Sequence, residues 1–309
     1  MQLTSEEEKL WRIFQPQAFE RINAALDDMR PTRFVHYTNA EAAMSILRGK
    51  EVWMRKAICM NDYTEVQHGL DCLYEAYKSS ELKSVLETLF SGFATEMESL
   101  FNGWTPAILW HTYLTCLSEH LDDENDYGRL SMWRAYGENT GIALVLNGKQ
   151  VLDAPEPIEA IYTVPVDYSD GQKFEAQLKA VGEDTKSNAE FIRSMGKEEI
   201  KGYVFQMLKF AAVCTKHPGF NEEKEWRIVY FPQIENTLEI RKEIKTIGGH
   251  PQPIFKIPIK NLPALLERII IGPTQHATSI WEAFVDTLIS AGVENPTSKV
   301  IISNIPLRR

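Results

Sequence analysis

The sequence predicts an α+β protein, and three observations carry that prediction. Amphipathic helical patterns occupy the first hundred residues, and the pattern then changes to short β-rich segments. The chain has 309 residues, a length that fits one large domain or two modest ones. No internal repeat, low-complexity tract or linker rich in proline and glycine divides it. We therefore expect a single domain over residues 1–309, with a helical cover at 5–29 and helical insertions at about 62–105 and 170–215.

Two capping-box patterns mark helix starts near the N-terminus. A serine or threonine followed three residues later by glutamate occurs at Ser5–Glu8 and again at Thr38–Glu41. Residues 32–37 lie between these helices and read as a strand, and the helix that follows Thr38 ends at Gly49. The first segment is expected to form one or two helices that cover a sheet.

A long apolar stripe follows at residues 81–101. Its apolar side chains recur with the 3.6-residue period of a helix. The stripe is wider than a small insertion can bury alone. We expect the helix at 82–100 to pack on residues 5–29 or to form a subunit interface of a homo-oligomer.

The rest of the chain is predicted to supply most of the sheet. Strands are expected at 52–55, 108–118, 141–146, 158–168, 225–232, 237–245, 252–258, 267–271 and 299–303. Helices are expected at 131–136, at about 276–291 and over most of 170–213, with a polar, loop-like interruption at residues 182–185.

The composition excludes several classes of protein. The formal net charge is -10 and the pI about 5.3, which is unlike a general nucleic-acid binder but does not exclude a local basic groove. The N-terminus lacks the apolar core of a secretory signal, and no apolar run reaches membrane-spanning length. The four cysteines form no CxxC pair, so neither a disulfide framework nor a zinc knuckle is indicated. A cytoplasmic location is expected.

A polar trio marks the late stretch at residues 223–230. If this stretch is extended, Glu223, Glu225 and Arg227 share one face. One interpretation is a solvated ladder of ion pairs. The other is a carboxylate that holds a ribose hydroxyl and stabilises an oxocarbenium-like transition state, as in the cleavage of glycosidic bonds.

Other motifs are spread in order along the chain. They are His36-Tyr37-Thr38; Asn61-Asp62 with Glu65; Cys116-x-Ser118; Met132-Trp133 with Tyr136 and Gly141; Phe220-x-x-Glu223-x-Glu225-Trp226-Arg227; Ile271-Gly272-Pro273; and Ser303-x-Ile305-Pro306. In this order the chain resembles a bacterial family known only as domain of unknown function 2971. The order of its elements also looks like the ADP-ribosyltransferase fold, a split mixed or antiparallel sheet.

The resemblance to ADP-ribosyltransferases implies a role for each motif. His36 would bond the adenosine-side ribose of NAD, with Tyr37 and Thr38 beside it. Glu225 would be the catalytic carboxylate, and Glu223 would orient the nucleophile. The resemblance also implies that Ser118 or Ser131 hydrogen-bonds the catalytic glutamate or the nicotinamide amide, and that Trp133 or Tyr136 stacks on nicotinamide. The candidates for binding the pyrophosphate are Arg33, Arg55 and Arg134. We then expect His36, Glu225 and at least one of the two aromatic residues to line one cleft.

The function implied is an NAD-dependent ADP-ribosyltransferase, with NAD as substrate and no metal. A chain of this kind would act inside a bacterium as a toxin or phage-defence effector on a macromolecular acceptor, protein or nucleic acid, and could have an antitoxin partner but no membrane partner. Two alternatives stay open. One is an NAD glycohydrolase, with water as acceptor. The other is a non-catalytic binding or sensor module on the same fold.

Three weaker patterns have simpler explanations. Asn61-Asp62-x-x-Glu65 could ligate a metal, but Asp62 also suits a helix N-cap. The strand that carries His111, Cys116 and His120 cannot bring all three to one ion. The stretch at 271–274 could cradle a phosphate, but a plain turn from strand to helix explains it as well.

Overall fold

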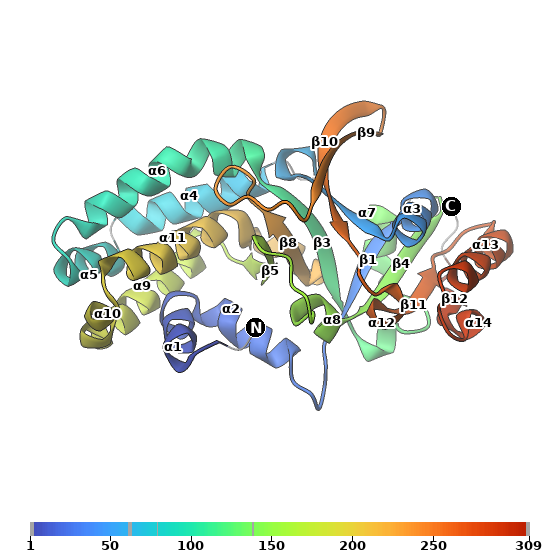
Figure 1. Ribbon diagram of the computed structural model, residues 1–309, viewed down its shortest axis with the longest axis horizontal. Coiled ribbons are helices and arrows are strands. Elements are labelled where there is room, and N and C mark those ends of the chain that lie inside the picture. The colour runs from blue at the N-terminus through green and yellow to red at the C-terminus, as the bar shows by residue number, and fades with distance from the viewer. Residues whose placement is uncertain (1–2, 61–63, 79, 138, 307–309) are drawn as a thin grey trace.

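The computed structural model describes residues 3–60, 64–78, 80–137 and 139–306 (Figure 1). Within these residues, helices flank a ten-stranded mixed sheet in which most neighbours are antiparallel and β11 and β12 are parallel. The α+β class predicted from the sequence is therefore confirmed.

The strands of the main sheet follow the order β12-β11-β4-β1-β3-β2-β10-β9, and β8 pairs with both β3 and β5. Their bounds are β1 (Arg33–Asn39), β2 (Glu51–Lys56), β3 (Tyr113–His120), β4 (Gly141–Asn147), β5 (Ile161–Pro165), β8 (Glu225–Tyr230), β9 (Arg241–Ile247), β10 (His250–Pro258), β11 (Leu266–Ile271) and β12 (Val300–Ile302). A separate parallel pair joins β6 (Asp167–Tyr168) to β7 (Thr215–Lys216).

The sheet splits along one edge of β3. On one side β3 pairs with β8 through residues 113–118. On the other side β2 pairs with Tyr113 and Leu114, and β1 pairs with residues 118–120. Residues 115–117 therefore face a gap between β1 and β2, where backbone groups need other hydrogen-bond partners.

The ladder register assigns each side chain to one of two faces. Val35 of β1 is the Cα partner of Ser118, and Ser118 is the partner of Glu225, so these three side chains leave the sheet on one side. We call this side the Glu225 face. Successive residues of a strand point in opposite directions, so His36 leaves on the other side, which we call the His36 face.

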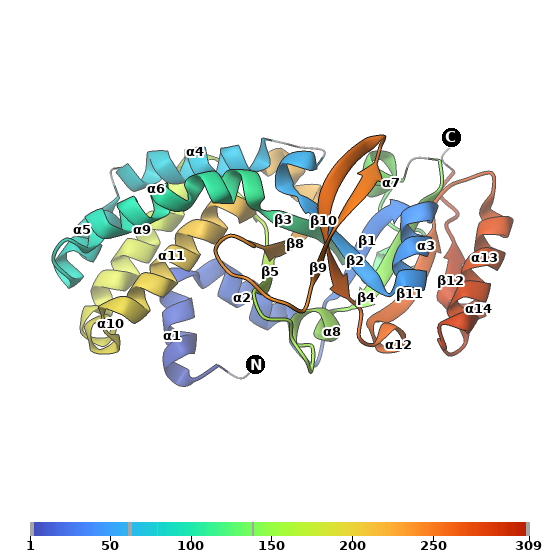
Figure 2. The ribbon, with the colours of Figure 1, turned by 45° about the horizontal axis from the view of Figure 1, so that its top comes forward.

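Helices cover both faces of the sheet. On the left of Figures 1 and 2 lie α4 (Glu65–Lys78), α5 (Glu81–Leu89), α6 (Phe93–His111), α9 (Gly171–Ser187), α10 (Ala189–Met195) and α11 (Lys197–Cys214). The other helices are α1 (Ser5–Phe14), α2 (Pro16–Ala25), α3 (Ala40–Gly49), α7 (Leu130–Tyr136), α8 (Gly148–Leu152), α12 (Leu262–Leu265), α13 (Ala277–Ser290) and α14 (Pro296–Lys299), and the short 3₁₀ turns are η1 (Ala57–Cys59), η2 (Asp122–Glu124) and η3 (Pro218–Glu223).

The apolar stripe at 82–100 packs mainly against the other helices of the group on the left of Figure 1. Its side chains share one buried cluster with α4, α9, α10 and α11, and α1 joins the same cluster. Phe93 is fully buried and Phe90 partly so, in edge-to-face contact with it. The main partners of the stripe are therefore α4, α9, α10 and α11, and not residues 5–29 as expected. The helical segments at about 62–105 and 170–215 bury each other's apolar faces.

Several predicted boundaries are wrong for tertiary reasons. The loop expected at residues 182–185 is helical, because Gly182 lets α9 approach α5 so closely that a Cβ there would lie 2.8 Å from the Leu82 nitrogen. The strand expected from residue 108 begins at Tyr113, because α6 continues through Pro106 to His111 and buries Ile108.

Both predicted N-caps are one residue from the observed ones. Thr4 caps α1, where its Oγ1 accepts from the Glu7 nitrogen at 3.2 Å and the Glu7 carboxylate accepts from Thr4 at 2.8 Å. Asn39 caps α3 by accepting from the Ala42 nitrogen at 2.9 Å, and Thr38 belongs to β1. A local pattern with two adjacent cap-forming residues does not say which one leaves the helix.

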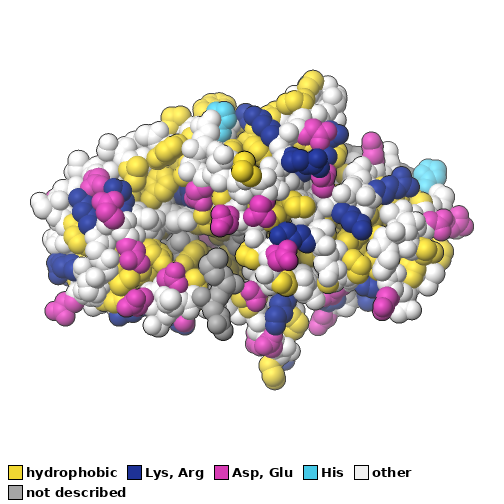
Figure 3. Space-filling model, in the orientation of Figure 1, with side chains coloured by type: hydrophobic (Ala, Val, Ile, Leu, Met, Phe, Trp, Pro, Cys, Tyr) yellow, Lys and Arg dark blue, Asp and Glu magenta, His cyan; other side chains and the backbone are white. Residues whose placement is uncertain are grey.

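The surface carries both signs of charge. Figure 3 shows acidic and basic side chains interspersed over the face it presents. Among the residues that the structure describes, no helix is long and apolar enough to cross a membrane.

Candidate functional site

The two glutamates of the E-x-E motif meet at the start of β8, but only one is on the strand. Glu225 opens β8, whereas Glu223 ends η3. Lys224 between them adopts φ +45°, the left-handed region that non-glycine residues rarely occupy. Residues 223–230 are therefore not one extended segment, so the condition under which alternation would put Glu223 on the face of Glu225 and Arg227 is not met. A backbone turn at Lys224, and not strand alternation, sets the place of Glu223.

Two cations bind these carboxylates. The Lys216 Nζ lies 2.7 Å from Glu223 Oε2 and 2.9 Å from Glu225 Oε2. The Arg227 Nε donates to Glu225 Oε1 at 2.8 Å, and its guanidinium also donates to the Val213 carbonyl. Each oxygen of Glu225 thus has a cationic partner. We call these four ionised residues, Lys216, Glu223, Glu225 and Arg227, the acidic cluster.

Burial separates the two glutamates. The Glu225 side chain is 4% exposed and that of Glu223 is 17% exposed. Burial opposes ionisation of Glu225, but Arg227 and Lys216 outweigh it and lower its pKa to about 2. Burial raises the pKa of Glu223 above its ordinary value; the Glu225 charge adds to this, and Lys216 opposes it. Glu225 is thus a locked anion, and Glu223 is the more accessible and more basic carboxylate.

Two tyrosines complete the surroundings of the cluster. The Tyr136 hydroxyl of α7 donates to Glu223 Oε1 at 3.2 Å. The Tyr168 hydroxyl accepts from the Glu225 backbone nitrogen at 2.7 Å. Burial raises the pKa of both phenols, so both stay neutral and keep their protons at neutral pH.

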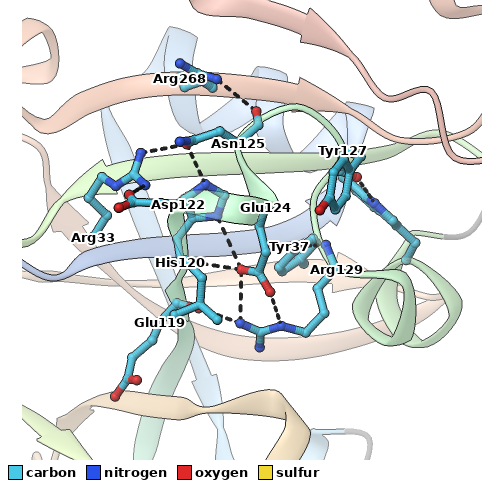
Figure 4. A network of polar contacts seen from close by, with 12 residues as sticks. Arg33, Tyr37, Glu119, His120, Asp122, Glu124, Asn125, Tyr127, Arg129 and Arg268 are labelled. Carbon is cyan, nitrogen blue, oxygen red and sulfur yellow. Dashed lines mark hydrogen bonds and ion pairs between the residues drawn. The ribbon is translucent and has the colours of Figure 1, made fainter.

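Arg129 holds the turn before β8 in place, and Figure 4 shows its contacts with Glu124 and Glu119. Its guanidinium binds the Glu124 carboxylate at 2.6 and 3.1 Å and the Glu119 carbonyl at 2.7 Å. The same group donates to the carbonyls of Glu222 at 2.8 Å and Glu223 at 3.1 Å. Five donors in a rigid fork suit this task, because one side chain then ties η2, β3 and η3 together.

Several predicted residues lie on the Glu225 face with this cluster. Ser118 is buried and paired with Glu225 in the ladder. Tyr37 and Trp133 make an edge-to-face contact, and the Tyr37 hydroxyl accepts from the Arg129 nitrogen at 2.8 Å. Trp133 is only 1% exposed, so of the two aromatic residues proposed against nicotinamide only Tyr136 borders a partly open site.

The two glycines of the neighbouring motifs pack on Trp133. A Cβ at Gly141 would lie 3.1 Å from its indole ring, and one at Gly272 would lie 2.9 Å from it. The Gly272 nitrogen also donates to the Gly141 carbonyl at 2.8 Å. This close packing accounts for the stretch at 271–274 without a phosphate.

His36 lies on the opposite face from Glu225. Its Nδ1 donates to the Cys116 carbonyl at 2.9 Å, across the gap between β1 and β3, and the ring lines a cavity on the His36 face. Burial lowers the pKa of His36 below its ordinary value, so the ring is neutral. The prediction that His36 and Glu225 line one cleft is therefore wrong, because the register pairs Val35, not His36, with Ser118 and Glu225.

The predicted pyrophosphate ligands are dispersed. Arg33 binds Asn125 at 2.7 Å and Asp122 at 2.5 Å. Arg55 donates to Gln252 at 3.1 Å and to the Cys59 carbonyl at 2.7 Å. Arg134 is exposed on α7, and Thr38 is half-buried on β1. The structure does not bring these arginines together.

The weaker metal patterns gain no support. Within the described part of the chain, no group of three or more His, Cys, Asp or Glu residues is placed to hold a metal ion. Asn61 and Asp62 lie outside the described residues, as does the side chain of Glu65. His120 instead belongs to the network of Figure 4, where its Nε2 lies 3.2 Å from Asn125 Oδ1.

The acidic cluster falls inside a segment that matches a known family. Residues 132–228 match the model of a family described as "Protein of unknown function (DUF2971)". The resemblance predicted from the motifs is thus confirmed over these residues, which include Tyr136 and all four residues of the cluster. His36 lies outside them. No curated protein and no solved structure matches the chain.

Sequence reasoning missed Lys216, Tyr168 and Arg129. The first two meet Glu225 because β6 and β7 pair in parallel, with Tyr168 opposite Lys216. Both strands have two residues and show no periodic pattern. Arg129 is a lone arginine in a turn. Only the spatial assembly identifies these three.

Proposed function

We propose that the acidic cluster is the reactive centre of an NAD-dependent ADP-ribosyltransferase, with Glu223 as the carboxylate that meets substrate. The supporting observation is the contrast between the two glutamates. Glu223 is partly exposed and hydrogen-bonded to the Tyr136 hydroxyl, whereas both oxygens of Glu225 are held by buried cations. The element order that resembles this enzyme fold, and the split in the sheet, support the proposal further.

The chemistry follows from the accessible carboxylate. The bond between ribose C1′ and the pyridinium nitrogen breaks, and nicotinamide leaves with the bonding electrons as a neutral molecule. Positive charge then develops on the ribose, and the Glu223 carboxylate stabilises it. A nucleophile on a protein or nucleic acid bonds to C1′, and its proton passes to Glu223, whose raised pKa suits a proton acceptor.

Glu225 becomes a positioning residue in this proposal. Its anion fixes Lys216, and Lys216 in turn holds the Glu223 carboxylate at 2.7 Å. Such preorganisation is the usual source of electrostatic catalysis, because the charges need not rearrange as the reaction proceeds. A toxin or phage-defence role inside a bacterial cell, as the resemblance implies, is part of the same proposal.

One observation favours a second candidate, a non-catalytic binding or sensor module. The sheet separates His36 from Glu225, the two residues to which the resemblance assigns NAD binding and catalysis, and two cations neutralise Glu225. A fold kept for recognition alone would tolerate both features. Turnover of NAD separates the two candidates.

The test uses labelled NAD with the purified protein and a whole-cell lysate, and the products are then divided by protease and nuclease. We expect Glu223→Gln to lower NAD consumption by about 100-fold or more, on the scale of losing a preorganised electrostatic group. The neighbouring and exposed Glu222 supplies the matched control, and Glu222→Gln should retain the wild-type rate.

Three outcomes distinguish the candidates. Label on a macromolecule supports the transferase and identifies its acceptor class. Loss of NAD without a labelled macromolecule indicates the glycohydrolase. Wild-type consumption by a folded Glu223→Gln protein refutes the proposed role of this carboxylate, and no consumption by the wild type leaves the binding module.

A further inference from the structure

A large cavity lies on the His36 face of the sheet, away from the acidic cluster. Its volume is about 680 Å³. Its walls come from the sheet, from α2, α3, α8 and α12, and from the loop at 153–160; Figure 1 shows α2, α8 and α12 along one side of the sheet. Small-molecule sites typically measure about 300–1,000 Å³. The cavity opens to solvent, so a molecule of that size can enter it.

The cavity is lined mainly by aliphatic side chains, and Gln150, Thr163 and Asn261 are among its polar lining residues. Leu117, Leu144 and Ile228 come from the sheet, and Ile46, Val151 and Leu262 come from the covering helices. The charged residues Glu156 and Lys260 also line it, and they pair with each other at 3.2 Å. Since this pair neutralises its own charge, the cavity favours a neutral and mainly apolar molecule.

His36 places one hydrogen-bond acceptor in this apolar wall. Its Nδ1–H is donated to the Cys116 carbonyl at 2.9 Å, so the neutral ring carries its lone pair on Nε2. The structure gives that Nε2 no partner among the described residues. A ligand that fills the cavity can satisfy it only with a hydroxyl or N–H group.

We propose that this cavity binds a neutral, apolar small molecule that donates one hydrogen bond to His36 Nε2. The site is separate from the acidic cluster, because the sheet lies between them. It does not depend on the proposed function, and it gives His36 a role that NAD chemistry on the Glu225 face does not require.

The test compares 2-naphthol with 2-methoxynaphthalene, which have the same rings but only the first has a donor. Binding to the full chain is measured by calorimetry. We expect the wild type to prefer 2-naphthol by roughly 2- to 10-fold, the value of one net hydrogen bond. His36→Phe should bind both probes equally. His36→Asn should also bind both probes equally. Its amide group keeps a hydrogen-bond donor near the Cys116 carbonyl, so this variant removes only the acceptor at the position of Nε2.

Two variants test the location of the probes. Val151→Trp on α8 and Val52→Trp on β2 each place an indole in the cavity from a different wall, and both should abolish binding of both probes. Ile289→Trp on the exposed face of α13 is the matched control and should bind as the wild type does. Circular dichroism and thermal melting confirm that each variant folds.

The outcomes decide the proposal. A 2-naphthol preference that disappears in both His36 variants, with binding lost in a folded tryptophan variant, supports it. Equal affinity of the wild type for the two probes overturns it, as does wild-type binding by both tryptophan variants. Absence of binding of either probe up to its solubility limit also overturns it.

Discussion

Replacing Glu225 by glutamine should destabilise the protein by about 3 kcal/mol. The substitution keeps the shape of the side chain but removes the charge that neutralises Arg227 and part of that on Lys216. Arg227 would then be a fully buried cation that has lost its carboxylate partner, although it still donates to the Val213 carbonyl. Removing one partner of a buried ion pair typically costs about 3–5 kcal/mol, because the other charge stays desolvated.

The pKa of Glu225 gives the same magnitude independently. Its neighbours lower that pKa from 4.5 to about 2. Each pKa unit is worth about 1.4 kcal/mol, so the ionised form contributes about 3 kcal/mol to the free energy of unfolding. A carboxyl group whose pKa is lower in the folded state than in the unfolded state stabilises the fold at pH values above its unfolded pKa. The contribution is therefore complete above about pH 5 and is lost as the pH falls from 4.5 towards 2.

Urea unfolding monitored by tryptophan fluorescence measures this loss. At pH 7 the midpoint of Glu225→Gln should fall with an unchanged slope, whereas Glu222→Gln should stay within about 0.5 kcal/mol of the wild type. Between pH 4.5 and 2 the gap between wild type and Glu225→Gln should close. The raised pKa of Glu223 acts in the opposite direction, and Glu225→Gln retains the part of that shift that burial causes, which is the largest. A loss below about 1 kcal/mol at pH 7, or a gap that is constant with pH, would refute the assignment of Glu225 as a buried, locked anion.

Two further stability predictions concern the helical layer. Gly182→Ala should destabilise the fold by about 1–3 kcal/mol, since its Cβ would meet the Leu82 backbone at 2.8 Å. The control Gly202→Ala on α11, whose Cβ meets open space, should stabilise the fold by about 0.5–1 kcal/mol. Shifts of the urea midpoint in the same direction for both variants would contradict this contact. Phe93→Ala should cost about 3–5 kcal/mol in the monomer and Ile289→Ala less than about 0.5, because the first side chain is fully buried and the second is 60% exposed; a loss for Phe93→Ala that appears only as dissociation of an oligomer would show the stripe to be an interface.

Much of the secondary structure followed from the sequence because it depends on local physics. The short apolar run that ends in Ile269-Ile270-Ile271 and the 3.6-period pattern at 277–290 correspond to β11 and α13, which lie close to the predicted bounds. The pairing of Glu225 with Arg227 also followed from strand alternation, which puts residues two apart on one face. In each case neighbours in the sequence supply the determining interactions.

Other features depended on contacts between distant segments. Ile108 belongs to a helix because α6 and α11 pack together. The β-forming residues next to it in the sequence favour a strand, so the helix could not be predicted locally. Gly182 lies inside the continuous helix α9. The absence of a side chain there allows α5 to pack closely against α9. Intrinsic propensities amount to less than about 1 kcal/mol per residue, so burial against another element overrides them.

The place of His36 illustrates the limit most clearly. Alternation along β1 shows from the sequence alone that His36 and Tyr37 point in opposite directions. Which of the two shares a face with Glu225 depends on the register of β1 against β3 and of β3 against β8. A slip of one residue in a single ladder exchanges the faces. That register is set by the burial of Val35 and Tyr37 against Trp133 and of Phe34 against Trp226, contacts that exist only once the chain has folded.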